Sequence, residues 1–278
     1  ARDHARRAAG AARLARAAAT EAERAAAQDQ VVRILRSLAL YYLPTGIETQ
    51  LWKSLDMSYF ARHDAGDIAW HARMLFRHLS DDKPVVAARI SSVGEGLQVL
   101  VYAPDRPDVF ARICGYFDRA SFNIQDARIH TTASGYVLDT FQIMASDPLK
   151  FEGVHYRDLI ALVENQLAEA VASEDPLHQP VRGRLSRRVK SFPVPPRVSL
   201  RPDERGQRWL LSVSASDRSG LLYVIARTLA KHEVNVQLAK VSTLGERVED
   251  TFLVTGASLN RDKAQLALET ELLEALAA

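Results

Sequence analysis

An internal repeat constrains the fold of this chain more than any other feature of its sequence. Asp105-Arg106 recurs 112 residues later as Asp217-Arg218. At the same offset, four further residues have counterparts: Asn123, Gln125, Ala127 and Thr131 recur as Asn235, Gln237, Ala239 and Thr243. Asp139-Thr140-Phe141 recurs as Asp250-Thr251-Phe252 at an offset of 111. Because such agreement in register is improbable by chance, we interpret the two halves as copies of one structural unit.

The hydrophobic pattern changes from a helical period to a strand period after Pro84, and both copies then follow one order of elements. In the first copy we predict strands over 85–90, 97–103, 122–132 and 136–144 and helices over 107–120 and 154–171. In the second we predict strands over 197–200, 209–215, 234–244 and 248–256 and helices over 220–232 and 260–276. A unit of this type forms a split βαβ layer, with two helices on one face of an antiparallel sheet.

The predicted fold class is therefore α+β: an N-terminal helical segment followed by two ferredoxin-like βαββα domains with antiparallel sheets. We expect the short leading strand of each copy to fill the fourth position of its sheet. The remaining unpaired edges leave two arrangements open, which are side-by-side packing of the copies and a homodimer through the sheets.

Four segments divide the chain. Residues 1–82 form a helical segment, since alanine, the best helix former, fills 14 of the first 30 positions. The first copy covers 84–172, a basic, proline-rich linker covers 173–196, and the second copy covers 197–278. Near the end of the helical segment, Asp67 is expected to cap a helix that runs to Leu79. Because the sequence starts with alanine rather than methionine, we expect a fragment or a processed product of a longer protein.

Composition argues against several classes of protein. The single cysteine, Cys114, cannot form an internal disulfide or a cysteine-based zinc site, which is typical of a reducing, cytoplasmic setting. No apolar run of about 18 residues occurs, so no membrane span is expected. The 36 basic and 34 acidic residues nearly cancel, and the basic cluster over 182–190 has no interleaved aromatic residues. We therefore do not expect nucleic acid as a partner.

No catalytic or metal-binding constellation is apparent. Phosphate-loop, dinucleotide-binding and nucleophile-elbow motifs are missing from the sequence. His71 and His78 are seven residues apart, which is longer than the spacing of four that lets two helical histidines hold one ion. We therefore predict neither a catalytic centre nor a metal site, and we interpret Asp139 and Asp250 as structural residues or as polar residues at a sheet edge.

The loop over 216–222 is the strongest candidate for a binding site. It joins a strand to a helix, and the unpaired amides of a helix N-terminus suit a carboxylate. Gly220 lets a ligand approach the backbone, Asp217 can take an ammonium group, and Asn235 opens the next strand with both a donor and an acceptor. The combination predicts a site for an α-amino acid. The simpler alternative is that Asp217 only caps the helix.

The equivalent loop of the first copy differs in one important position. It keeps the acid, but Asp108 stands where the second copy has Gly220, and a carboxylate there repels an anionic group. We expect Asp105, Arg106 and Asn123 to form a weaker second site or to play a structural part.

The second copy resembles a known family. The run 217–222 (DRSGLL) and the stretch 244–252 (LGERVEDTF) are similar to the last ACT domain of the bifunctional uridylyltransferase/uridylyl-removing enzymes, which modify the nitrogen regulatory protein PII. Residues 51–52, 59–60 and 67–70 resemble the helical stretch that precedes the ACT pair in this family. The resemblance covers about residues 45–278.

The resemblance implies a regulatory region that senses glutamine and has no catalytic domain of its own. It implies PII and the enzyme's catalytic domains as partners, Mg²⁺ as a cofactor of those domains alone, and allosteric control of uridylylation. Carried over by position, the glutamine site consists of Asp217, Arg218, Gly220, Leu221 and Asn235. A stand-alone ACT-repeat sensor of amino acids remains the alternative. A nucleic-acid-binding ferredoxin-like module ranks lower, since 122–132 offers only one aromatic residue for base stacking.

Overall fold

The computed structural model describes residues 29–30, 32–33, 37, 47–55, 57–79, 81–92, 95–180, 194–203, 208–241, 243–244 and 247–277. Most of the alanine-rich start and the basic cluster of the linker lie outside this part of the chain. The chain divides into two compact units, Ala1–Leu79 and Ser80–Ala278, and each is described by itself. No helix of the described part is both long and apolar enough to cross a membrane.

The described part of the first unit contains the helices α2 (Ile47–Lys53), α3 (Met57–Arg62) and α4 (Ala65–Leu75). The N-cap of α4 is Asp64, whose extended backbone lets its carboxylate accept from the amide of Asp67 at 2.8 Å. The cap is therefore three residues earlier than the sequence pattern suggested, and the helix ends at Leu75. His71 is fully buried, and its Nδ1 lies 2.6 Å from the hydroxyl of Tyr59, so this histidine is part of the helical core.

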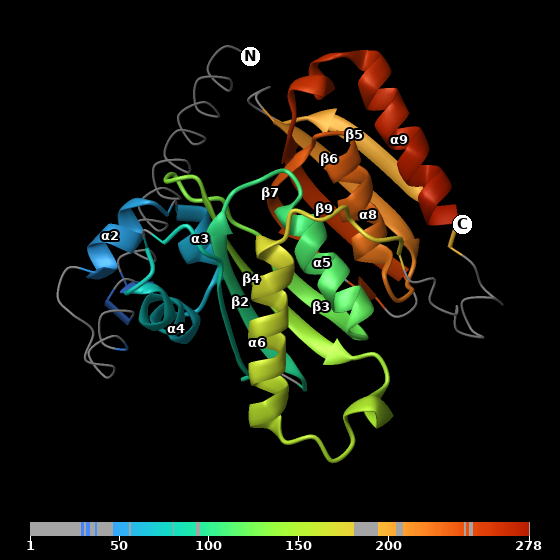
Figure 1. The fold of residues 1–278 in the computed structure, drawn as a ribbon. Coiled ribbons are helices and arrows are strands. Elements are labelled where there is room, and N and C mark those ends of the chain that lie inside the picture. The colour runs from blue at the N-terminus through green and yellow to red at the C-terminus, as the bar shows by residue number, and fades with distance from the viewer. Residues whose placement is uncertain are drawn as a thin grey trace, which may run out of the picture. The chain divides into compact units, whose positions relative to one another are not determined.

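The second unit contains both copies of the repeat (Figure 1). The first copy consists of β1 (Val85–Ile90), β2 (Leu97–Pro104), α5 (Val109–Arg119), β3 (Phe122–Arg128), β4 (Tyr136–Ala145), the 3-10 helix η1 (Pro148–Phe151) and α6 (Tyr156–Ala172). The second consists of β5 (Arg197–Pro202), β6 (Trp209–Ser216), α8 (Leu221–Lys231), β7 (Asn235–Lys240), β8 (Thr243–Leu244), β9 (Arg247–Thr255), the 3-10 helix η2 (Ala257–Asn260) and α9 (Asp262–Ala277).

The two copies share one antiparallel sheet. Its strands follow the order β1-β2-β4-β3-β7-β9-β6-β5, and β8 pairs with β9. The predicted α+β class is confirmed, and β1 and β5 occupy the fourth position of their copies, as expected. Each outer strand has one amide bound by a helix, since Glu164 of α6 accepts from the amide of Ala88 and Glu269 of α9 accepts from the amide of Leu200. The domain limits 84–172 and 197–278 stay a prediction.

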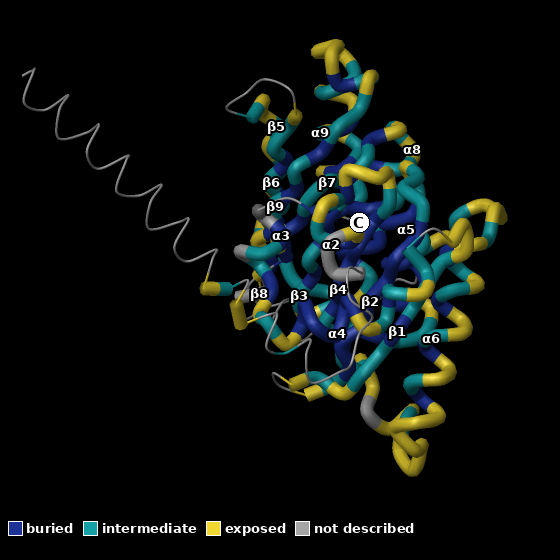
Figure 2. The backbone as a smooth tube through the Cα atoms, turned by 90° about the vertical axis from the view of Figure 1, so that its left-hand side faces the viewer, coloured by how far each residue is buried: buried dark blue, intermediate teal, exposed yellow. Residues whose placement is uncertain are grey.

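The copies meet side by side about a local two-fold relation. β3 and β7 pair antiparallel through Arg128 and Lys240. Lys240 is the residue of the second copy that corresponds to Arg128 at the offset of 112. Phe110 of the first copy packs edge-on to Phe252 of the second, with ring centroids 6.3 Å apart. Buried residues of both copies form one continuous hydrophobic core, which Figure 2 shows as dark blue along the strands and the helices that face them. Ligand-binding residues of one copy can therefore lie next to those of the other.

A bulge interrupts the same strand of each copy. The pairing of β3 with β4 skips Gln125, and the pairing of β7 with β9 skips Gln237. Both glutamines belong to the repeated residues. A bulge turns a side chain away from the regular alternation of a strand, which commonly happens beside binding sites.

Candidate functional site

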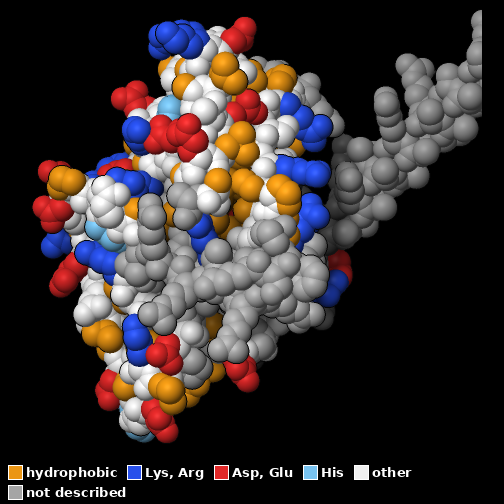
Figure 3. All heavy atoms as spheres, turned by 90° about the vertical axis from the view of Figure 1, so that its right-hand side faces the viewer, with side chains coloured by type: hydrophobic (Ala, Val, Ile, Leu, Met, Phe, Trp, Pro, Cys, Tyr) orange, Lys and Arg blue, Asp and Glu red, His pale blue; other side chains and the backbone are white. Residues whose placement is uncertain are grey.

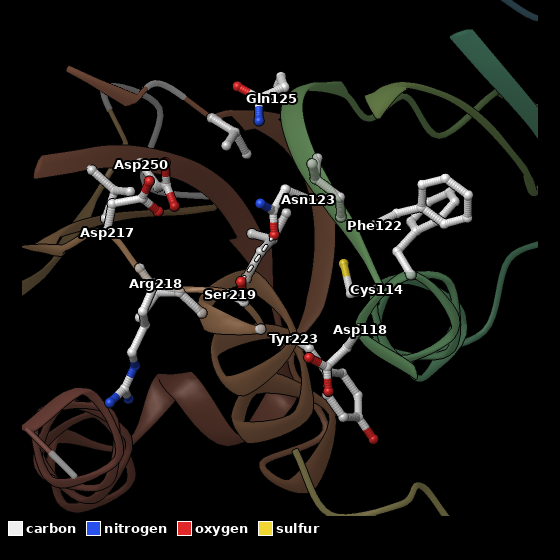
Figure 4. Close-up of a pocket in the computed structure, with 17 residues that line it drawn as sticks. Cys114, Asp118, Phe122, Asn123, Gln125, Asp217, Arg218, Ser219, Tyr223 and Asp250 are labelled. Carbon is white, nitrogen blue, oxygen red and sulfur yellow. Dashed lines mark hydrogen bonds between the residues drawn. The ribbon is translucent and has the colours of Figure 1, made fainter. Parts of the chain in front are cut away.

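A cavity of about 240 Å³ lies between the two copies (Figure 4). The second copy contributes Asp217, Arg218, Ser219, Gly220, Leu221 and Asp250 to its wall, and the first contributes Cys114, Asp118, Asn123 and the bulge residue Gln125. Since one water molecule needs about 10–15 Å³ of such space, the cavity has room for a small polar molecule. Four of the five residues expected at the glutamine site line it.

The backbone of Gly220 shapes the loop at the start of α8. Its φ of 79° and ψ of 0° are left-handed, a conformation that favours glycine. Gly220 is also the N-cap of α8, and it has no side chain to bind the first amides of the helix. Asp217 lies three residues before the cap, so it is not the capping residue considered as the simpler alternative. The loop therefore presents a helix N-terminus and a carboxylate to the same cavity.

The repeated asparagines cross from one copy to the other. Asn123 of the first copy accepts a hydrogen bond from the hydroxyl of Ser219 at 3.2 Å, and Asn235 of the second donates to Asp105 at 3.0 Å. The cavity at Asp217 therefore contains Asn123, and Asn235 lies at the other loop. Sequence reasoning had assigned each asparagine to the loop of its own copy. Because β3 and β7 pair at corresponding residues, a two-fold relation connects the copies, and the asparagine of each copy lies at the loop of the other.

Both repeated arginines point to the end of a helix. The guanidinium of Arg218 donates to the carbonyl of Ala275 in the last turn of α9 at 2.7 Å, and Figure 4 shows it directed away from the cavity. In the same way Arg106 donates to the carbonyl of Val171 in the last turn of α6 at 2.6 Å. Cations suit a helix C-terminus, which explains this contact of both arginines. Arg218 lines the cavity without directing its charge into it.

The loop of the first copy is arranged differently. Asp108 has a φ of −100° and directs its carboxylate to the side chain of Arg112 at 2.6 Å, so much of its charge is balanced within the protein. Burial raises the pKa of Asp105, while the hydrogen bond from Asn235 lowers it. Where the second copy has Ser219, the first has Pro107, which has no hydroxyl to bind an asparagine. Asn235 bonds directly to the loop carboxylate instead.

The strand carboxylates are buried rather than at an edge. Asp139 is 1% exposed and Asp250 is 2% exposed, and their strands β4 and β9 are paired on both sides. Burial raises the pKa of Asp139 well above its usual value, and the amide of His130 donates to its Oδ1 at 3.1 Å. Asp250 lines the cavity, and Figure 4 shows it beside Asp217. The sequence showed that both acids were repeated but not that one of them faces a cavity.

Cys114 adds no nucleophile to the cavity. Burial raises the pKa of its thiol, and the carboxylates of Asp139, Asp118 and Asp250 raise it further. A thiol that keeps its proton is a poor nucleophile. The arrangement favours reversible binding over covalent chemistry.

The charges of the site suit a zwitterion. Carboxylates of Asp217, Asp250 and Asp118 line the cavity and attract an ammonium group, while the amides at the start of α8 suit a carboxylate. Among the described residues, no group of three or more histidine, cysteine, aspartate or glutamate side chains could hold a metal ion.

The visible surface shows no face of a single charge. On the side drawn in Figure 3, acidic and basic side chains are interspersed over the described residues.

Comparison with known proteins shows strong similarity to one enzyme. Residues 19–74 match the family described as the fifth domain of the uridylyltransferase GlnD. The bifunctional uridylyltransferase/uridylyl-removing enzyme of Ralstonia nicotianae is 60% identical over 82% of this chain, and that of Cupriavidus metallidurans is 61% identical over 82%. The same enzyme of Burkholderia vietnamiensis is 52% identical over 90%.

This chain is a homologue of the C-terminal part of the bifunctional uridylyltransferase/uridylyl-removing enzymes. It spans only about a quarter of their length, since the matches cover 26% of the first two relatives and 28% of the third. The resemblance noted in the sequence is therefore confirmed.

Proposed function

We propose that this chain is the glutamine-sensing regulatory region of a bifunctional uridylyltransferase/uridylyl-removing enzyme, built on a pair of ACT domains. It binds glutamine and biases the catalytic domains of the enzyme between adding uridylyl groups to the PII protein and removing them. The observation that carries this proposal is the cavity between the two copies, which combines the helix start after Gly220 with acidic groups.

Glutamine fits the chemistry of the cavity group by group. Its α-carboxylate suits the amides at the start of α8. Its α-ammonium suits Asp217, with Asp250 beside it. Its side-chain amide both donates and accepts, and so do the amides of Asn123 and Gln125 on the opposite wall.

A ligand between two copies can act as a switch. It contacts both walls, so it favours the arrangement of the copies that holds both walls at the right distance. A ligand shifts an equilibrium only by its difference in affinity for the two states. A coupling of about 1–3 kcal/mol, which is typical of allosteric proteins, requires only a modest difference in contacts.

Calorimetry and thermal unfolding with glutamine test the proposal. We expect glutamine to raise the melting temperature of the chain, and Asp217→Ala to abolish the rise. A hydrogen bond to a charged group contributes about 1.5–3 kcal/mol, so Asp217→Ala should weaken binding by about 10- to 150-fold. Well-folded protein that binds no glutamine at millimolar concentration would overturn the proposal.

The repeated asparagines provide a matched pair of variants. Asn123→Ala removes a neutral side chain from the cavity wall and should weaken glutamine binding by about 2- to 12-fold. Asn235→Ala changes the equivalent position at the other loop and should leave the affinity within about twofold. If Asn235→Ala has the larger effect, glutamine binds at the other loop. A panel of other amino acids in the same assay identifies the preferred ligand.

A further inference from the structure

The chain leaves α6 as a strap, which we define as residues 173–180. Figure 1 shows it as the yellow coil that follows α6 and runs across α5 toward α8. Gly115 of α5 lies directly beneath it, where a Cβ atom would be 2.9 Å from the ring of His178 and 2.8 Å from that of Tyr223. A side chain at position 115 would therefore push the strap away from the helices.

His178 attaches the strap to α8. Its imidazole stacks on the ring of Tyr223 with centroids 4.6 Å apart and an angle of 24°. The hydroxyl of Tyr223 donates to the carbonyl of His178 at 2.7 Å and lies 3.2 Å from its Nδ1. The other ring nitrogen, Nε2, lies 3.8 Å from the carboxylate of Asp118 on α5. One histidine thus contacts a helix from each copy.

The residues that hold His178 also form the wall of the cavity. Tyr223 and Asp118 both line the cavity between the copies, together with Cys114 one turn before Asp118. Tyr223 is 1% exposed, and the side chain of Asp118 is 3% exposed. Both residues therefore line the cavity and also contact His178 of the strap, so a shift of either residue affects both places.

We propose that His178 is a positioning residue for the cavity: docked on Tyr223 and Asp118, it holds the wall in the shape that binds ligand, so ligand binding and strap docking favour each other. The identity of the ligand rests on the proposed function, but the coupling between strap and cavity does not. The strap is the first part of the linker over 173–196, so this coupling connects the state of the cavity to the linker.

The charges around His178 make this contact sensitive to pH. It faces Asp118 and Arg119 of α5 and Tyr223 and Arg227 of α8. Burial lowers the pKa of His178 below 6.5, Arg119 and Arg227 lower it further, and Asp118 opposes them. The docked imidazole therefore has a lower pKa than an undocked one and stays neutral to a lower pH. Docking is at full strength above the undocked pKa of about 6.5 and weakens as the pH falls through the lower, docked pKa.

Two variants of His178 separate its contacts. His178→Ala removes the stacking and both ring contacts, so we expect about tenfold weaker glutamine binding at pH 8. His178→Phe keeps the stacking and the backbone carbonyl but cannot take up a proton, so it should restore most of the affinity. Between pH 8 and pH 5.5, affinity should fall in the wild-type chain by more than in His178→Phe. His155→Phe, at an exposed histidine before α6, is the matched control and should keep the wild-type profile.

The single cysteine supplies a readout that needs no ligand. Cys114 is 1% exposed in the cavity wall, so the rate at which a thiol reagent labels it reports opening of that wall. We expect His178→Ala to raise this rate about tenfold, and His178→Phe to return it close to the wild-type rate.

Three results would overturn the proposal. They are equal pH profiles of wild type and His178→Phe, wild-type labelling of Cys114 in His178→Ala, and glutamine affinity unchanged by His178→Ala. If the wild-type chain binds no glutamine at any pH, the proposed function fails, while the labelling rates alone still decide whether strap and cavity are coupled.

Discussion

Replacement of Gly220 by alanine tests the backbone conformation on which the cavity depends. Gly220 has a φ of 79°, and a side chain in the left-handed region costs about 1–2 kcal/mol. In a unit of this size, 1 kcal/mol shifts the melting temperature by about 2–4 °C, so Gly220→Ala should lower it by about 2–8 °C. Thermal and denaturant unfolding measure both quantities. An alanine variant as stable as the wild type would refute the left-handed assignment.

Gly153 provides a control with the same backbone strain. Its φ is 77°, and a Cβ atom there would meet nothing within 4 Å. Gly153→Ala should therefore cost about as much stability as Gly220→Ala, but it lies outside the residues that line the cavity. Glutamine affinity should fall only in Gly220→Ala. If both variants lose affinity equally, the loss reflects general destabilisation, and the argument about the loop is wrong.

Two further variants test the contacts of charged side chains. Arg218→Ala removes the hydrogen bond to Ala275 and should lower the free energy of unfolding by about 0.5–1.5 kcal/mol. Glutamine affinity, measured by calorimetry, should stay unchanged. A large loss of affinity would mean that the guanidinium contacts the ligand. Burial raises the pKa of Asp139 in the folded protein, so its carboxyl group favours folding below the unfolded pKa of about 3.8 and opposes it as the pH rises through the folded pKa. Asp139→Asn should therefore raise the free energy of unfolding at pH 8, with a smaller gain at pH 5. Denaturant unfolding at both pH values measures this, and no gain, or a gain that grows on acidification, would contradict the argument.

Much of the fold follows from local patterns in the chain. Strand and helix periods placed β1 over 85–90 as the structure has it and located the other predicted strands and helices of both copies to within a few residues. The exception is the strand predicted over 234–244, which the structure divides into β7 and β8. The repeat showed that the copies share one topology. These features are local or depend on self-similarity, so they can be read along the chain. The cap at Asp64 was less apparent, because two aspartates three residues apart both suit a helix start and only the backbone conformation selects one.

The assembly of the site is not a local property. Asn123 and Asn235 are equally placed in the sequence, and the natural expectation is that each serves its own copy. Pairing of β3 with β7 at equal positions exchanges them, because an antiparallel contact between identical strands relates the copies by a two-fold axis. Contacts more than a hundred residues apart along the chain set this exchange, and hydrophobic periodicity contains no information about them.

The sequence by itself determined the fold class, the two copies and the loop at Asp217, because element periods, turn residues and repeats are written in neighbouring positions. Only the tertiary structure decided that the cavity lies between the copies, that Asn123 rather than Asn235 faces it, and that Arg218 binds a helix end instead. The physical reason is that a cavity is made by two surfaces, and the register between the surfaces depends on how the whole sheet packs.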